Sequence, residues 1–224
     1  MKTLPRGGKH YSLRRIMDLN RYDPDELLLE YLTIRANVPD EVFYNKPKYR
    51  KVMELWCAAQ FARGYEKHVA PCAVWVHDGD AQTYFDFQLE AEAVRQDFQL
   101  TEVQLPNRRR GAEYRNGGPK TRTTVEDWDN GEKDGWQWIA AAINAKRQHY
   151  GGDVQELNLL VYVNYPAVEH PYFDLQNQLA ETAAPFRSVW LLSGHALACV
   201  SGNVRAIDAL PGWMFLPDDP VYKP

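Results

Sequence analysis

The run of residues 157–163, Leu-Asn-Leu-Leu-Val-Tyr-Val, constrains the fold more than any other stretch of the chain. It is apolar on both faces over most of its length and rich in residues that favour strands. A strand of this kind lies in the centre of a sheet that is covered on both sides. The preceding residues 136–150 carry Ile139 and Ile143 at helical spacing and are followed by two glycines. The sequence therefore predicts an α/β fold with a mixed central β-sheet flanked by helices.

Local signals predict the other elements. A helix is expected to start at Asp23, because Asp23 can cap it, Pro24 suits its first turn and Glu26 completes a capping box. A second helix is expected from about residue 47 to about residue 65, and a third from the region of residue 171 to residue 179. Further strands are expected at residues 72–76, 83–89, 97–105, 188–192 and 196–200, and the first three of these should form an antiparallel meander.

The composition limits the setting of the protein. The 224 residues suffice for one sizeable core, and the net charge of -4 argues against attraction of the whole chain to nucleic acid. Three cysteines without a CxxC pair favour a reducing compartment, and no stretch approaches the roughly 18 apolar residues that a membrane helix needs. We therefore expect a cytoplasmic protein without a membrane partner. The expected parts are an N-terminal helical extension (1–46), an α/β core (47–200) and an irregular Pro-rich tail (201–224).

A polar insertion interrupts the core at about residues 106–135. It shows no hydrophobic periodicity, so it is expected to be a long loop. Its first half is basic and could contact nucleic-acid phosphates, whereas its second half is acidic. On charge alone, a solvated and self-neutralising surface loop is the favoured interpretation. The basic residues in question are Arg108, Arg109, Arg110, Arg115, Lys120 and Arg122.

Glu54 stands out in the second helix because its helical neighbours Cys57, Ala58 and Phe61 are apolar. A carboxylate on such a face needs a partner, a proton or a metal, since burying it alone is costly. The alternative is a boundary position at which Glu54 reaches solvent or pairs with Lys51.

A second pattern is Glu102-Val103-Gln104, which ends a strand whose first residues on the same face are Phe98 and Leu100. Asp86 lies 16 positions earlier, a spacing that fits one strand end, a turn and a returning strand. Asp86, Glu102 and the carbonyl of Val103 could then hold one magnesium or manganese ion, while Gln104 orients water or phosphate. The plainer interpretation is a half-exposed strand whose polar end faces solvent.

Lys146 is the one charged member of the apolar stripe on the predicted helix 136–150. It could bring a positive charge toward the site. The commoner arrangement is a buried aliphatic stem with the ammonium group in water.

The order of these features resembles the restriction-endonuclease-like, or PD-(D/E)xK, nuclease superfamily. That family has an Asp at the end of its second strand, Glu-x-Lys on the third, and a Glu on the preceding helix. Asp86, Glu102-Val103-Gln104 and Glu54 match these positions, and the resemblance covers about residues 47–165. The chain departs from the pattern at Gln104, which replaces the lysine, and we hypothesise that Lys146 supplies the missing charge from a neighbouring element.

The resemblance implies a restriction-endonuclease-like core and a magnesium-dependent nuclease that hydrolyses phosphodiester bonds of DNA. Asp86 and Glu102 would bind the metal, Glu54 would assist, and nucleic acid, DNA in the first place, would be the partner. Nucleases of this type often act as homodimers. The alternative is a catalytically inactive relative that serves as a nucleic-acid-binding or protein-interaction module, which Gln104 and the net charge of -4 favour.

Overall fold

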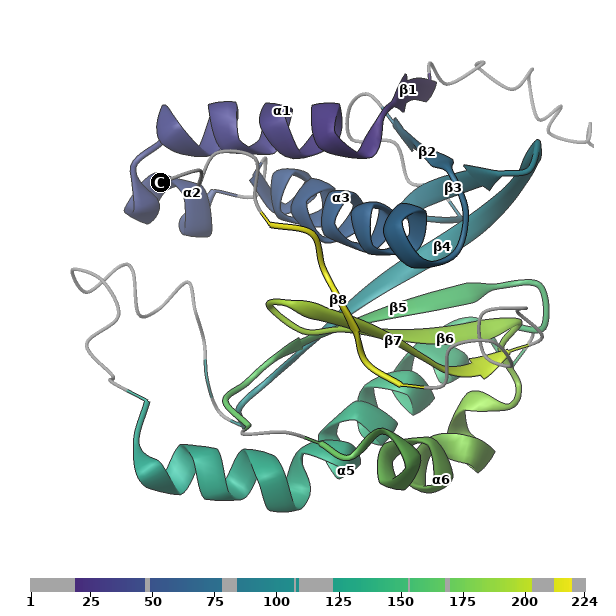
Figure 1. Ribbon diagram of the computed structural model, residues 1–224. Helices are drawn as coiled ribbons and strands as arrows, with labels where there is room; N and C mark the ends of the chain where they lie inside the picture. Colours follow the sequence, from purple (N-terminus) through teal and green to yellow (C-terminus); the bar gives the residue numbers. More distant parts are fainter. Residues whose placement is uncertain are drawn as a thin grey trace, which may run out of the picture.

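The computed structural model describes residues 19–46, 49–77, 84–106, 108, 123–152, 154–167, 170–202 and 212–218. Within them, eight strands form one mixed sheet, with helices on both faces (Figure 1). The strands are β1 (Leu19–Tyr22), β2 (Cys72–His77), β3 (Phe87–Ala91), β4 (Val94–Gln104), β5 (Asn158–Asn164), β6 (Ser188–Leu192), β7 (Ala196–Gly202) and β8 (Met214–Phe215). The helices are α1 (Pro24–Ala36), α2 (Asp40–Asn45), α3 (Arg50–His68), α5 (Val125–His149) and α6 (Tyr172–Ala183).

The strands lie in the sheet in the order in which they occur in the chain. Strands β1 to β4 are antiparallel, β4, β5 and β6 are parallel, and β6 to β8 are antiparallel again. Helices α5 and α6 make the two connections between the parallel strands. The predicted mixed α/β sheet and the meander β2–β3–β4 are therefore confirmed. The finer expectation, a restriction-endonuclease-like core, is not confirmed by these observations.

Two cores fill the space between the sheet and its helices. Helices α1 and α3 cover one face, and α5 and α6 cover the other (Figure 1). On the α3 face, Phe61 contacts Phe98 and Trp190, with ring centroids 4.9 and 5.3 Å apart. On the α5 face, Ile139 and Ile143 are fully buried in a cluster that includes Val103. Strand β5 contributes to both cores, as its two apolar faces predicted.

Helix starts follow the capping signals of the sequence. Asp23 caps α1 and forms the predicted capping box with Glu26. Thr124 and Asp127 form a second capping box at the start of α5. Helix α5 thus begins at Val125, so the expectation of a long loop over 106–135 is wrong for its last eleven residues. The rest of that insertion, apart from residues 106, 108, 123 and 124, lies outside the described residues.

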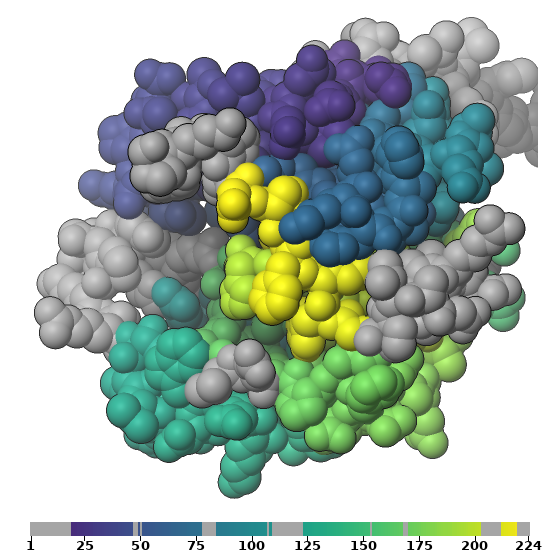
Figure 2. Space-filling model, in the orientation of Figure 1, coloured from purple at the N-terminus to yellow at the C-terminus, as the bar shows by residue number. Residues whose placement is uncertain are grey.

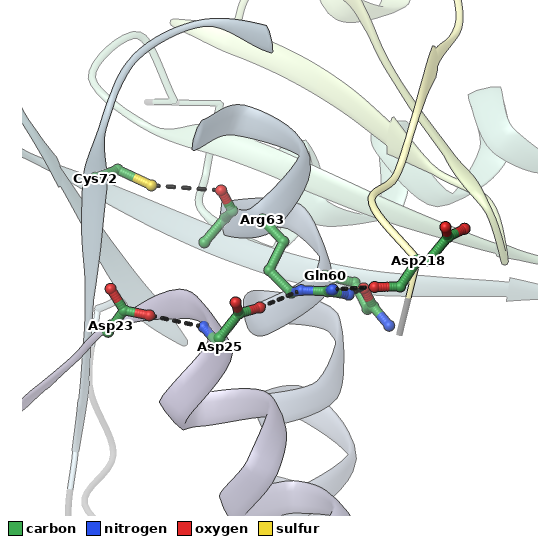
Figure 3. A network of polar contacts seen from close by, with 7 residues as sticks. Asp23, Asp25, Gln60, Arg63, Cys72 and Asp218 are labelled. Atoms are coloured by element: carbon green, nitrogen blue, oxygen red, sulfur yellow. Dashed lines mark hydrogen bonds and ion pairs between the residues drawn. The ribbon is translucent and has the colours of Figure 1, made fainter. Parts of the chain in front are cut away.

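The C-terminal segment 212–218 joins the sheet instead of running irregularly, because β8 pairs with β7. In Figure 2 this segment, in yellow, lies between helix α3 and strands that come later in the chain than α3. Figure 3 shows how Arg63 of α3 anchors it: the guanidinium donates to the carbonyl of Asp218 at 2.6 Å and to Asp25 of α1 at 2.6 Å. The proposed division into extension, core and tail is not tested and stays a prediction.

None of the described helices combines the length and the apolar character needed to cross a lipid bilayer. The predicted cytoplasmic location is not tested by this finding.

Candidate functional site

A cleft of about 670 Å³ opens at the carboxyl ends of the parallel strands β4 and β5, on the face covered by α3. Crevices at the carboxyl ends of parallel strands are the usual ligand sites of α/β sheets. The volume lies in the range of about 300–1,000 Å³ that small-molecule sites have. The cleft is lined by Tyr31, Phe43, Tyr44, Met53, Glu54, Trp56, Cys57, Leu100, Thr101, Glu102, Arg108 and Tyr162.

Glu102 is the best-defined polar group of the cleft. Its two carboxylate oxygens each accept an amide hydrogen bond, from Gln104 Nε2 at 2.7 Å and from Asn164 Nδ2 at 2.5 Å. The parallel register places Asn164 opposite Gln104 and Tyr162 opposite Glu102. The two amide donors fix the orientation of the carboxylate.

Aromatic rings from four elements line the same cleft. Trp56 of α3 and Tyr162 of β5 meet edge to face, with ring centroids 5.1 Å apart. Phe43 of α2 packs edge to face with Tyr31 at 6.3 Å and with Tyr44 at 5.2 Å. The lining therefore combines apolar ring surface with a few polar groups, the composition typical of sites for small organic molecules.

The structure brings together part of the predicted site. Glu54 and Glu102 both line the cleft, from α3 and β4, and Arg108 joins them after the end of β4. Gln104 contacts the cleft through its hydrogen bond to Glu102. The roles predicted for these side chains are not tested. The remaining basic residues of the insertion lie outside the described residues: Arg109, Arg110, Arg115, Lys120 and Arg122.

Asp86 precedes β3 and is not among the described residues that line the cleft. Phe87 pairs with Phe98 across β3 and β4, and both rings stack in the α3 core, 5.0 Å apart. The backbone N–H of Asp86 also donates to the carbonyl of Phe98 at 2.8 Å, so two residues oppose one, as in a β-bulge. The Oδ2 atom of Asp86 accepts from the backbone N–H of Leu100 at 2.6 Å. Burial, and then the charge of Asp86, raise the pKa of Tyr150, the residue that caps the end of α5.

Lys146 is on the α5 face. Its ammonium group donates to Gln99 Oε1 at 2.9 Å, and Gln99, which is 3% exposed, donates in turn to the carbonyl of Tyr84 at 2.8 Å. Gln99 and Glu102 are three positions apart on β4 and so face opposite sides of the sheet. The structure thus does not bring Lys146 to Gln104, contrary to the idea that it supplies a charge there.

The metal expectation receives no support from the described residues, among which no group of three or more His, Cys, Asp or Glu side chains could hold an ion. Of the two expected carboxylate ligands, Glu102 accepts from two amides beside the cleft, whereas Asp86 accepts from the backbone N–H of Leu100. The side chain of Val103 is buried in the α5 core. Magnesium or manganese binding, a nucleic-acid partner and a homodimer are not tested further and stay predictions.

Sequence reasoning missed the aromatic lining of the cleft. Tyr31, Phe43, Tyr44 and Tyr162 come from three elements that the fold brings together, and no local pattern relates them. The only signal was the aromatic share of 12%, which calls for either a core or a ligand surface.

Comparisons with known proteins add a structural likeness. No family model and no curated protein matches the chain. A solved structure of a protein of unknown function from Pseudomonas aeruginosa, described as belonging to a monooxygenase superfamily, matches with a TM-score of 0.40 and 16% identity. The match covers 88% of this chain and 97% of the other. A likeness at this TM-score and identity assigns neither a family nor an activity to this chain.

The nuclease interpretation requires correction. The carboxylate of Asp86 accepts from the backbone N–H of Leu100, and Lys146 donates to Gln99 on the face opposite to Glu102, so neither side chain joins Glu102 in the cleft. The resemblance to the PD-(D/E)xK superfamily, and the DNA-hydrolysing metal-dependent endonuclease inferred from it, are therefore wrong. The side chains that were expected to meet are separated in the folded chain.

Proposed function

We propose that the protein binds a small organic molecule with an aromatic or planar apolar part in the cleft between α3 and the ends of β4 and β5. The observation that carries the proposal is the fixed carboxylate of Glu102 inside an aromatic lining. The rings of Trp56 and Tyr162 offer apolar contact area, and the carboxylate accepts a hydrogen bond from a donor group of the ligand.

The location supports the proposal independently of the lining. The cleft is bordered by β4 and β5, which belong to the central, parallel part of the sheet, and by the helix α3, which packs on it through a fully buried core. Side chains that project from such elements are held more precisely than side chains on loops. The cleft can therefore select a ligand by shape and by the position of its donor group.

A panel of small aromatic compounds with neutral, cationic and anionic substituents tests the proposal. Binding is measured by ligand-detected NMR and calorimetry on the wild-type chain and on two cleft variants, Tyr162→Ala and Glu102→Gln. Panel members that bind should lose about five- to tenfold in affinity in Tyr162→Ala, the equivalent of roughly 1–1.4 kcal/mol of aromatic contact.

Glu156→Gln is the matched control. Glu156 is 93% exposed, lies in the turn before β5 and pairs with Arg187 at 3.3 Å, away from the residues that line the cleft. It should leave binding unchanged. The proposal fails if no member of the panel binds the wild-type chain, or if every member binds both cleft variants as well as it binds the control.

A further inference from the structure

We propose that Arg35 is the positioning residue of one wall of the cleft and thereby determines the size of the ligands that the cleft selects. This inference rests on the proposed function and concerns the specificity of the same site. The wall is helix α2, whose rings Phe43 and Tyr44 both line the cleft. The inference follows from the contacts that hold α2 in place.

Helix α2 depends on its neighbours for its position. It is six residues long, and a helix of that length is not stable in water without tertiary contacts. Pro39 is its N-cap residue and gives it no side-chain hydrogen bond, whereas α1 and α5 both begin with capping boxes. Contacts with other elements must therefore fix where the two rings lie.

Arg35 supplies such contacts along the whole of α2. It lies in the last turn of α1, and its guanidinium donates to the carbonyl of Val38 at 3.2 Å and to the carboxylate of Asp40 in the first turn of α2. The same guanidinium lies over the Phe43 ring, 4.8 Å from the centroid, and 5.3 Å from the centroid of Tyr44. A planar guanidinium can donate from its edge while its face lies against a ring. One side chain thus joins α1 to both ends of α2.

Other contacts keep α2 in the fold when Arg35 is replaced. Phe43 is 1% exposed, and its ring stacks on Tyr49 at 5.5 Å and meets Tyr31 edge to face at 6.3 Å. The loss of Arg35 should therefore loosen the wall without removing it. A loosened wall is less preorganised for a small ligand and is displaced more easily by a large one. Arg35 accordingly favours small ligands over large ones.

Three neutral phenols of increasing ring number test the inference: phenol, 2-naphthol and 9-phenanthrol. They carry the same hydroxyl group and differ in aromatic area. Equilibrium dialysis gives the ratio of the affinity for 9-phenanthrol to the affinity for phenol in the wild-type chain and in Arg35→Met, which keeps a long unbranched side chain without the guanidinium. The ratio should rise about fivefold in Arg35→Met, a factor equivalent to one aromatic contact. A variant that only lost stability would bind all three phenols more weakly by the same factor and would keep the wild-type ratio.

A second variant and a matched control complete the test. Arg35→Lys keeps a positive charge but lacks the fork that reaches Val38 and Asp40 together, so its ratio should lie between those of the wild type and Arg35→Met. The control is Arg95→Met.

Arg95 is suited to this comparison because its guanidinium also combines an ion pair with a ring contact. It lies 2.9 Å from Glu90 and 3.5 Å from the centroid of Trp75. These three residues are not among the described residues that line the cleft. Arg95→Met should therefore leave the ratio unchanged.

The outcomes separate this inference from the proposed function. An unchanged or lowered ratio in Arg35→Met, with binding retained, would overturn the role of Arg35 and leave the small-molecule cleft in place. An equal rise in Arg95→Met would overturn it as well. If Arg35→Met does not fold, the ratio in Arg35→Lys decides in the same way. Failure of the wild-type chain to bind any of the phenols or any member of the aromatic panel would remove the proposed function, and this inference with it.

Discussion

Arg63 shows how one side chain can join distant parts of the chain. It is 4% exposed, and its guanidinium donates to Asp25 on α1, to Gln60 on its own helix and to the carbonyl of Asp218 near the C-terminal end (Figure 3). A buried charge persists only when it is paired and hydrogen-bonded. The planar, five-donor guanidinium suits three separate acceptors, which a lysine could not serve in the same geometry.

Arg63→Gln should therefore lower the free energy of unfolding by about 2–4 kcal/mol, because the buried acceptors lose their donor. Arg187→Gln is the matched change at an exposed pair, since Arg187 and Glu156 are 49% and 93% exposed, and it should cost less than about 1 kcal/mol. Urea unfolding of both variants measures the two effects. Equal losses in the two variants would contradict the anchoring role of Arg63.

His170 should make stability depend on pH. Burial lowers the pKa of His170, and the charge of Glu132 opposes this in part. Its Nε2 lies 3.0 Å from the Tyr165 hydroxyl, and its backbone carbonyl accepts from Trp213 Nε1.

Because the folded state disfavours the protonated ring, the unfolded state binds more protons as the pH falls below the ordinary value of 6.5. The contribution of His170 is fully present above that value and is lost as the pH falls through the lower pKa of the folded protein. His170→Asn should flatten the fall in stability between pH 7 and pH 5, measured by urea unfolding at each pH. An unchanged slope would show that other groups cause the dependence.

At the scale of elements, features that depend on neighbouring residues could be predicted from the sequence. Features that depend on how the strands pair could not. Three features could be predicted because each depends on neighbouring residues: the cap of α1, the end of α5 before two glycines, and the meander. The first turns of α5 were missed because they are polar and hold two glycines, both unfavourable to a helix assignment. The positions of Asp86 and Glu102 relative to one another depend on the Phe87–Phe98 register, which no pattern within one strand reveals.

The glycines of α5 are required by packing. A Cβ at Gly135 would lie 2.4 Å from the Tyr165 hydroxyl oxygen, and one at Gly131 would lie 1.9 Å from the carbonyl oxygen of Pro166. Alanine favours a free helix by about 1 kcal/mol over glycine. We expect Gly135→Ala to lower stability by about 1–3 kcal/mol instead, because overpacking prevails over helix propensity.

Thermal unfolding of Gly135→Ala, alone and combined with Tyr165→Leu, measures the effect. Part of the loss should be recovered in the double variant, in which the ring that the new methyl group meets is gone. A single variant more stable than the wild type would contradict the close packing of α5 against Tyr165.

The turn between β3 and β4 carries strain that can be relieved. Glu92 and Ala93 both have positive φ, 51° and 62°, which is the left-handed region that favours glycine. Ala93→Gly should raise the free energy of unfolding by about 0.5–1 kcal/mol. The control is Ala184→Gly at the end of α6, where φ is -52° and glycine should lower stability. Chemical unfolding compares the two, and a loss of stability in Ala93→Gly would contradict this account of the turn.

At the scale of the whole molecule, the sheet divides the protein into two halves with different contents. The α5 face holds a core together with the polar contact of Lys146, while the α3 face opens into the cleft at the ends of β4 and β5. Glu54 and Glu102 of the expected site share this cleft, and the roles predicted for them stay predictions. The aromatic lining, which gives the cleft its proposed ligand, emerges only when α1, α2, α3 and β5 assemble around it.

Methionine methyl NMR tests the central claim, ligand binding in this cleft, most directly. Met53 lines the cleft and Met214 is buried in β8, so the chain carries a reporter and an internal control. In protein labelled with ¹³C at the methionine methyl groups, the tightest-binding member of the aromatic panel should shift the Met53 signal with saturation and leave Met214 in place. Tyr162→Ala should weaken that response. A Met53 signal that stays unmoved under saturating amounts of every panel member would contradict the account.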